Sequence, residues 1–146
     1  MKKFLCLTVA VALAGAMFVG CSSKGMKDGT YKAEFSTADS HGWTDYVEVT
    51  VSGEKITAVD FDSVNAEGLK KSADEAYNKM MKDTGSATWP SDFFPKLEEN
   101  LIKAQGADKV DAVAGATDSS NSLKKLAKEL EKNISKGDTA TVKVAR

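Results

Sequence analysis

The chain has 146 residues, of which 42% are hydrophobic and 28% charged, and its formal net charge is −1. This length and composition fit one ordinary globular domain. The near-neutral charge argues against a nucleic-acid-binding protein, which would carry a basic face.

The first twenty residues have the pattern of a secretory signal peptide. Lys2 and Lys3 precede a mostly apolar run over residues 4–19, which is too short to span a membrane comfortably. The run ends in Phe-Val-Gly-Cys, which resembles a lipobox. We therefore predict a signal peptide over residues 1–20, lipidation of Cys21 and a polar tether over residues 21–27. The alternative is an ordinary signal peptide that leaves Cys21 as a free thiol.

Processing at this point would change what the mature chain can do. Cys6 would be removed, so no cysteine pair would remain for a disulfide, a metal cluster or a thiol redox couple. Loss of Lys2 and Lys3 would leave 18 basic against 21 acidic side chains, a net charge of −3. Because that charge argues against electrostatic membrane binding, the lipid would hold the protein to the extracytoplasmic side of the membrane.

Alternating side chains predict three strands in the first half of the chain, over residues 29–35, 45–52 and 56–64. Each has apolar residues at every second position, as a half-buried strand requires. A glycine-containing turn over residues 52–55 separates the second and third runs, which predicts a β-hairpin.

Apolar spacing of three and four residues predicts helices over residues 69–82, 90–106 and 120–136. The first would bury a stripe containing Ala73, Ala76, Tyr77 and Met80 or Met81. The second would be capped by Ser91 or Asp92, with Pro95 in its first turn, and the third would end at Gly137.

Two further segments complete the predicted fold. Residues 109–113 form a short strand candidate, and residues 138–146 are either an edge strand or a frayed tail. This order of elements predicts an α+β fold, with an antiparallel-dominated sheet and the helices packed on one side.

The segment Asp-Ala-Val-Ala-Gly-Ala-Thr-Asp-Ser-Ser at residues 111–120 precedes the strongest helical pattern. Its small residues leave the backbone exposed. The free N–H groups and dipole of a helix start favour an anion such as a phosphate. The alternative is that Thr117, Ser119 or Ser120 simply caps the helix.

This segment resembles the D-x-x-(S/T)-G-A-T signature of the FMN-binding domain family, with Ala114 in place of the usual Ser or Thr. Asp-Gly-Thr-Tyr at residues 28–31, the hairpin and the final helix match the family's order over about residues 28–135. The resemblance implies that Thr117 carries FMN through a phosphoester. It also implies cofactor-binding roles for neighbouring residues, namely Asp111, Gly115, Ala116, Ser119 and Ser120.

The resemblance further implies a flavin transferase that takes FMN from FAD with Mg²⁺, and a membrane electron donor linked to a quinone or to NADH. We thus expect residues 28–137 to form the FMN-binding domain of a lipoprotein that carries electrons outside the cytoplasmic membrane and is not a turnover enzyme. The alternatives are a lipoprotein that binds a small ligand or FMN without a covalent bond, and a cofactor-free surface lipoprotein.

Other candidate residues have weaker patterns. His41 is the only histidine; it is either simply exposed or lies beside the flavin. Trp43 and Trp89 either pack in the core or stack on the isoalloxazine ring. Asp60, Asp62 and Asn65 lack calcium-loop spacing, so we expect solvent-facing acids and no metal site. Residues 62–65 also look like a signature of the lipoprotein branch near the cofactor pocket.

Overall fold

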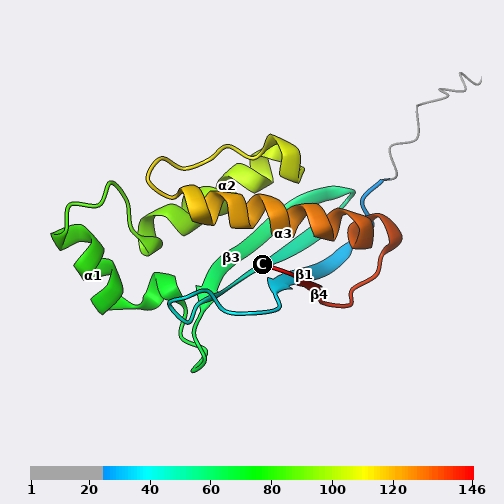
Figure 1. The fold of residues 1–146 in the computed structure, drawn as a ribbon. Coiled ribbons are helices and arrows are strands. Elements are labelled where there is room, and N and C mark those ends of the chain that lie inside the picture. Colours follow the sequence, from blue (N-terminus) through cyan, green and yellow to red (C-terminus); the bar gives the residue numbers. More distant parts are fainter. Residues whose placement is uncertain (1–24) are drawn as a thin grey trace, which may run out of the picture.

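The computed structural model describes residues 25–146 (Figure 1). The predicted signal peptide, residues 1–20, and the predicted lipidation site, Cys21, lie outside the described residues. No helix within residues 25–146 combines the length and apolar character that a membrane span needs.

One four-stranded sheet forms the base of the domain, in the order β3-β2-β1-β4. β1 (Gly29–Phe35), β2 (Thr44–Ser52) and β3 (Lys55–Val64) pair antiparallel, as the alternating patterns and the hairpin turn predicted. β4 (Val142–Val144) lies parallel to β1 at the sheet edge, so the C-terminal segment takes the edge-strand alternative.

Three α-helices follow the hairpin in sequence: α1 (Glu75–Asp83), α2 (Pro90–Ala104) and α3 (Thr117–Lys136). α2 packs against β3, and α3 lies across β1 and β2, with both helices on the same side of the sheet (Figure 1). The predicted α+β class and its antiparallel-dominated sheet are therefore confirmed.

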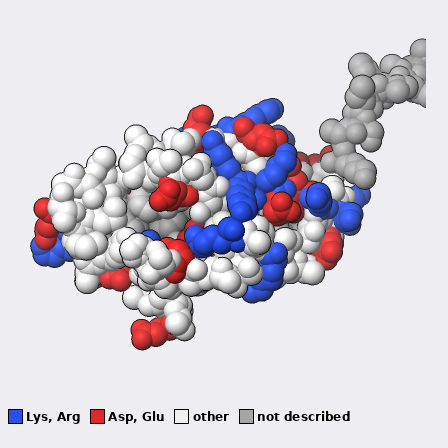
Figure 2. Space-filling view, in the orientation of Figure 1, with Lys and Arg blue, Asp and Glu red and all other residues white. Residues whose placement is uncertain are grey.

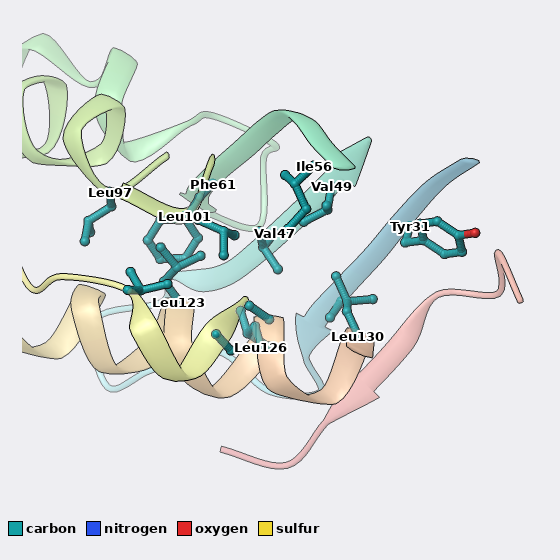
Figure 3. Close-up of a cluster of buried hydrophobic side chains, with 14 of the residues drawn as sticks. Tyr31, Val47, Val49, Ile56, Phe61, Leu97, Leu101, Leu123, Leu126 and Leu130 are labelled. Carbon is teal, nitrogen blue, oxygen red and sulfur yellow. The ribbon is translucent and has the colours of Figure 1, made fainter. Parts of the chain in front are cut away.

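The core lies between this sheet and α2 and α3. Figure 3 shows strand and helix side chains pointing toward one another across that space. Leu123, Leu126 and Leu130 of α3 are fully buried, and Val47 and Phe61 of the sheet are equally inaccessible. Burying a leucine side chain is worth about 1.5–3 kcal/mol, so this contact fixes the position of α3 on the sheet.

The predicted helix over residues 69–82 was wrong in its bounds and in its buried face. A short 3₁₀ turn, Lys71–Ala73, comes first, and α1 begins after Asp74, whose side chain accepts a hydrogen bond from Tyr77 N at 2.9 Å. The buried residue of α1 is Asn78, whereas Met80 is 48% exposed. The apolar stripe predicted here therefore does not enter the core.

Other local predictions were wrong. α2 begins at Pro90, as predicted, but its N-cap is Trp89, so neither Ser91 nor Asp92 is the cap. Proline is tolerated at this first position because it lacks only an N–H that needs no partner. Pro95 consequently lies inside the helix, on its exposed side. Residues 109–113 form no strand: a 3₁₀ turn, Ala107–Lys109, leads into irregular backbone that has no neighbouring strand to pair with.

Candidate functional site

The chain enters α3 through a tight turn over residues 113–116. Ala116 N donates to Val113 O at 3.0 Å, and Gly115 has a φ of 80°, which favours glycine at this position of a type II turn. A Cβ at Gly115 would lie 3.1 Å from Ala87 Cβ and 3.2 Å from Thr88 Cγ2. Both the conformation and the close approach of the neighbouring loop therefore require glycine here.

Ser120 holds this turn from within the helix. Its hydroxyl accepts from Val113 N at 3.1 Å and donates to Ala116 O at 2.7 Å, and the residue is 1% exposed. The hydroxyl of Ser120 is thus buried and already engaged, and the predicted cofactor contact of this residue stays a prediction. Ser120 supports the turn that presents Thr117.

We expect Ser120→Ala to lower the free energy of unfolding by about 1–3 kcal/mol, because Val113 N would lose its partner in a partly buried place. Urea denaturation measures the change. Ser135→Ala is a matched control, since that hydroxyl bonds only to Lys132 O at an exposed position. Equal stability of the two variants would contradict a supporting role for Ser120.

Thr117 is the first residue of α3 and is exposed. The N-cap is Ala116, and no side chain caps this helix, unlike α1 with its Asp74 cap. Capping by Thr117, Ser119 or Ser120, the alternative left open by the sequence, is therefore excluded. The start of α3 keeps its uncapped N–H groups and its favourable dipole for an anion.

Two hollows meet at the start of α3. The Thr117 hollow, of about 320 Å³, is lined by Gly115, Ala116 and Thr117 on one side and by Met81, Pro90 and Phe93 on the other. The Arg146 hollow, of about 540 Å³, is polar and lies between α3 and the β1–β2 loop. Lys71, Tyr77, Asp118 and Ser119 line both.

Charge is unevenly spread over this side of the molecule. Lys and Arg side chains gather over α3, mixed with acidic residues, whereas the surface between α1 and the start of α3 is mainly uncharged (Figure 2). The wall of the Thr117 hollow combines aromatic and aliphatic side chains, such as Tyr77 and Met81, with the charged side chains of Lys71 and Asp118. Such a lining suits a flat apolar ring with a charged group at its end.

The β1–β2 loop brings His41 to the Arg146 hollow. Asp39 Oδ1 accepts from His41 N at 2.8 Å and from Trp43 N at 2.9 Å, which orders the loop. Partial burial opposes ionisation of Asp39, but these two N–H groups outweigh it and lower the pKa of the carboxyl. His41 is exposed on the rim of this hollow.

The two tryptophans lie outside the walls of both hollows. Trp43 is 7% exposed and meets the ring of Tyr77 edge-on at 6.1 Å between centroids, so the packing alternative holds. Trp89 is half-buried, with the Lys82 ammonium 4.7 Å from its ring centroid. Asp111 is also exposed away from both hollows, and Asn100 binds its carbonyl at 2.9 Å.

The segment over residues 62–65, which holds one acidic residue, orders the chain that leads to Lys71. The expectation of solvent-facing acids was wrong for Asp62, which is buried. Asp62, 3% exposed, accepts from Ser72 Oγ at 2.5 Å and from Ser72 N at 3.2 Å, and burial raises the pKa of this carboxyl. Asn65 Oδ1 accepts from Glu67 N and Leu69 N. Asp62 and Asn65 thus both accept from backbone N–H groups that follow them in the chain. Their hydrogen bonds fix the Lys71–Ala73 turn beside the two hollows.

The sequence profile of the FMN-binding domain matches residues 42–131. This range includes the β2–β3 hairpin, α1, α2, the Gly-Ala-Thr turn and most of α3. The chain belongs to the FMN-binding domain family.

Two individual similarities extend over most of the chain. It is 35% identical over 138 residues to the 15 kDa lipoprotein of Treponema pallidum (strain Nichols), covering 94% of this chain and 92% of that protein. A crystal structure of a Clostridium perfringens protein is 38% identical with a TM-score of 0.78, covering 83% of this chain and 98% of that one.

The residues of this FMN-binding domain fit the group that its family binds. An exposed hydroxyl, an uncapped helix start and a hollow with an aromatic wall lie together at Thr117. Sequence reasoning found Thr117 through its motif but missed Lys71 and Phe93, and it placed Tyr77 in the core. Their spacing matches an ordinary amphipathic helix, so only the fold could bring them to the site.

Proposed function

We propose that this protein is a membrane-anchored lipoprotein that carries FMN in phosphoester linkage on Thr117 and passes electrons outside the cytoplasmic membrane. The observation that supports it most is the place of Thr117: exposed, first in an uncapped helix, and on the wall of the Thr117 hollow. The family match supports the flavin, and the name of the Treponema pallidum relative supports the lipid anchor at Cys21.

Attachment requires a flavin transferase with FAD and Mg²⁺. The Thr117 hydroxyl loses its proton, its oxygen forms a bond to the FMN phosphorus, and the pyrophosphate bond breaks so that AMP leaves. Asp111, Gly115 and Ala116 form the recognised motif. The exposure of this turn lets another protein reach the hydroxyl, and Gly115 keeps the turn in the shape described above.

Bound FMN supplies the redox chemistry. The chain's own residues bind and orient the group: the start of α3 favours the phosphate, and Tyr77, Met81 and Phe93 offer an apolar wall. The electron donor is a membrane dehydrogenase linked to a quinone or to NADH. In this proposal the domain is a carrier, because it holds one redox group and exchanges electrons with partners.

The test is the intact mass of the full chain, exported from cells that also express a flavin transferase. We expect a gain of one FMN less one water, and flavin fluorescence that stays with the band on a denaturing gel. Unmodified mass in the presence of an active transferase would overturn the proposal. A flavin that denaturation releases would instead support non-covalent binding and would overturn the phosphoester.

A further inference from the structure

Lys71 occupies a defined place between the two hollows. It is the first residue of the Lys71–Ala73 turn and lines both the Thr117 hollow and the Arg146 hollow. Its ammonium lies 4.8 Å from the ring centroid of Tyr77 and 5.4 Å from that of Trp43. Cation–π contacts of this kind hold the charge but leave its N–H donors available.

The surroundings of Lys71 are rigid. The next residue, Ser72, is bound through its N–H and its hydroxyl by the buried carboxylate of Asp62. Trp43 is buried and packs edge-on against Tyr77. The lysine side chain is therefore held at its base by a hydrogen-bonded turn and at its ammonium by two rings.

Within residues 25–146 no ion pair joins the Lys71 ammonium to a carboxylate. The carboxylate that its charge reaches is Asp39, in the wall of the Arg146 hollow, where Lys71 helps to lower the pKa of that group. Other lysines differ in place or pairing. Lys125 lines the Arg146 hollow but not the Thr117 hollow, and Lys82 faces Trp89 outside both. Lys71 is the one basic residue in the described wall of the Thr117 hollow.

A phosphoester between Thr117 and the ribityl chain of FMN is a diester and carries one negative charge. The uncapped start of α3 offsets part of that charge. Asp118, on the same wall and in the first turn of α3, opposes it with a carboxylate. One ammonium facing the same hollow supplies the missing positive charge.

We propose that Lys71 is the counter-ion of the phosphodiester on Thr117 and thereby holds the flavin ring in the Thr117 hollow, against Tyr77 and Phe93. This rests on the proposed attachment of FMN to Thr117. Lys71 is a positioning residue: it does not take part in electron transfer, and it sets how much of the time the ring is docked. An ion pair at a partly exposed site changes such an equilibrium by about two- to fivefold.

The experiment compares the full-length protein with Lys71→Met, Lys71→Arg and Lys79→Met, each flavinylated by a co-expressed transferase with FAD and Mg²⁺. Lys79 is the matched control, since its ammonium is exposed on α1, pairs with Asp83 and lies outside both hollows. Intact mass gives the fraction of chains that carry FMN. Acrylamide quenching of flavin fluorescence, read at low and high salt, gives the fraction of rings that are exposed.

We expect quenching to rise about two- to fivefold in Lys71→Met, with Lys71→Arg and Lys79→Met close to the wild type. We also expect added salt to raise quenching in the wild type but not in Lys71→Met, because salt screens an ion pair and not an apolar contact. The salt series on the wild type decides the question even if Lys71→Met does not fold.

Two negative results have different meanings. Wild-type chains that carry FMN but show salt-independent quenching, with Lys71→Met unchanged, would overturn the role of Lys71 and leave the carrier proposal intact. Wild-type chains with no FMN mass would overturn the carrier proposal, and the role of Lys71 with it.

Discussion

Replacing Thr117 by alanine is expected to leave the exported chain entirely without covalent flavin while its stability stays within about 0.5 kcal/mol of the wild type. The variant removes the oxygen that would bond to phosphorus. It removes no cap, because Ala116 is the N-cap of α3, and no buried contact, because Thr117 is exposed. Intact mass after co-expression with a transferase measures the first effect, and urea denaturation the second.

Two variants sharpen this test. Thr117→Ser keeps a hydroxyl in the same place and should still accept FMN, which would show that the oxygen is what matters. Thr139→Ala removes an exposed threonine hydroxyl far along the chain from the turn and should leave the flavin mass unchanged. If Thr117→Ala still gained one FMN, the acceptor would have to be another oxygen, and Ser119 on the same wall would be the first to examine.

The sequence predicted those parts of the fold that depend on local pattern. Strict alternation predicted the β2–β3 hairpin, and the leucine spacing predicted α3 with its end at Gly137. The same reasoning failed around α1. There the Asp62 carboxylate binds Ser72, ten residues later, and holds it in a separate 3₁₀ turn. Asp74 then caps a new helix through Tyr77 N, so side-chain hydrogen bonds set the bounds and the apolar spacing did not.

The residues of the candidate site were likewise only partly predictable from the sequence. The motif around Thr117 is contiguous in sequence, so it could be recognised there. The opposite wall comes from a 3₁₀ turn, α1 and the start of α2, and residues such as Lys71 and Phe93 reach the site only through tertiary packing. Ser120 differs from both groups. Its position in the motif suggested a ligand contact, but its hydroxyl is buried and accepts a hydrogen bond from Val113 N of the turn.

The chain enters the domain at the end of α3 that lies opposite Thr117. Lys27 N donates to Ile134 O at 3.1 Å, and Tyr31 OH donates to Lys27 O at 2.8 Å, so the start of the domain is tied to the last turn of α3. α3 has 20 residues, which corresponds to a length of about 30 Å. An anchor at Cys21 would therefore put the flavin at the membrane-distant end, open to a partner in the aqueous phase.

Cys21→Ser is expected to move the protein from the membrane fraction to the soluble fraction. Each buried CH₂ of an acyl chain contributes about 0.8 kcal/mol to membrane binding, and two chains give stable anchoring. Without them little remains, because residues 22–27 offer one apolar side chain, Met26, which packs against the core. The net charge of −3 after processing gives no attraction to an anionic bilayer.

The mass of the variant must be measured with its location, because an uncut leader would itself hold the chain to the membrane through the apolar run at residues 4–19. Soluble protein that lacks both leader and lipid is the expected result. Membrane attachment of protein with the leader removed and no lipid mass would contradict the anchor at Cys21. Flavin on Thr117 should be unaffected, since Lys27, where the tether meets the domain, is bound to the last turn of α3 and Thr117 begins that helix. Solubility and flavin content thus test the anchor and the carrier separately.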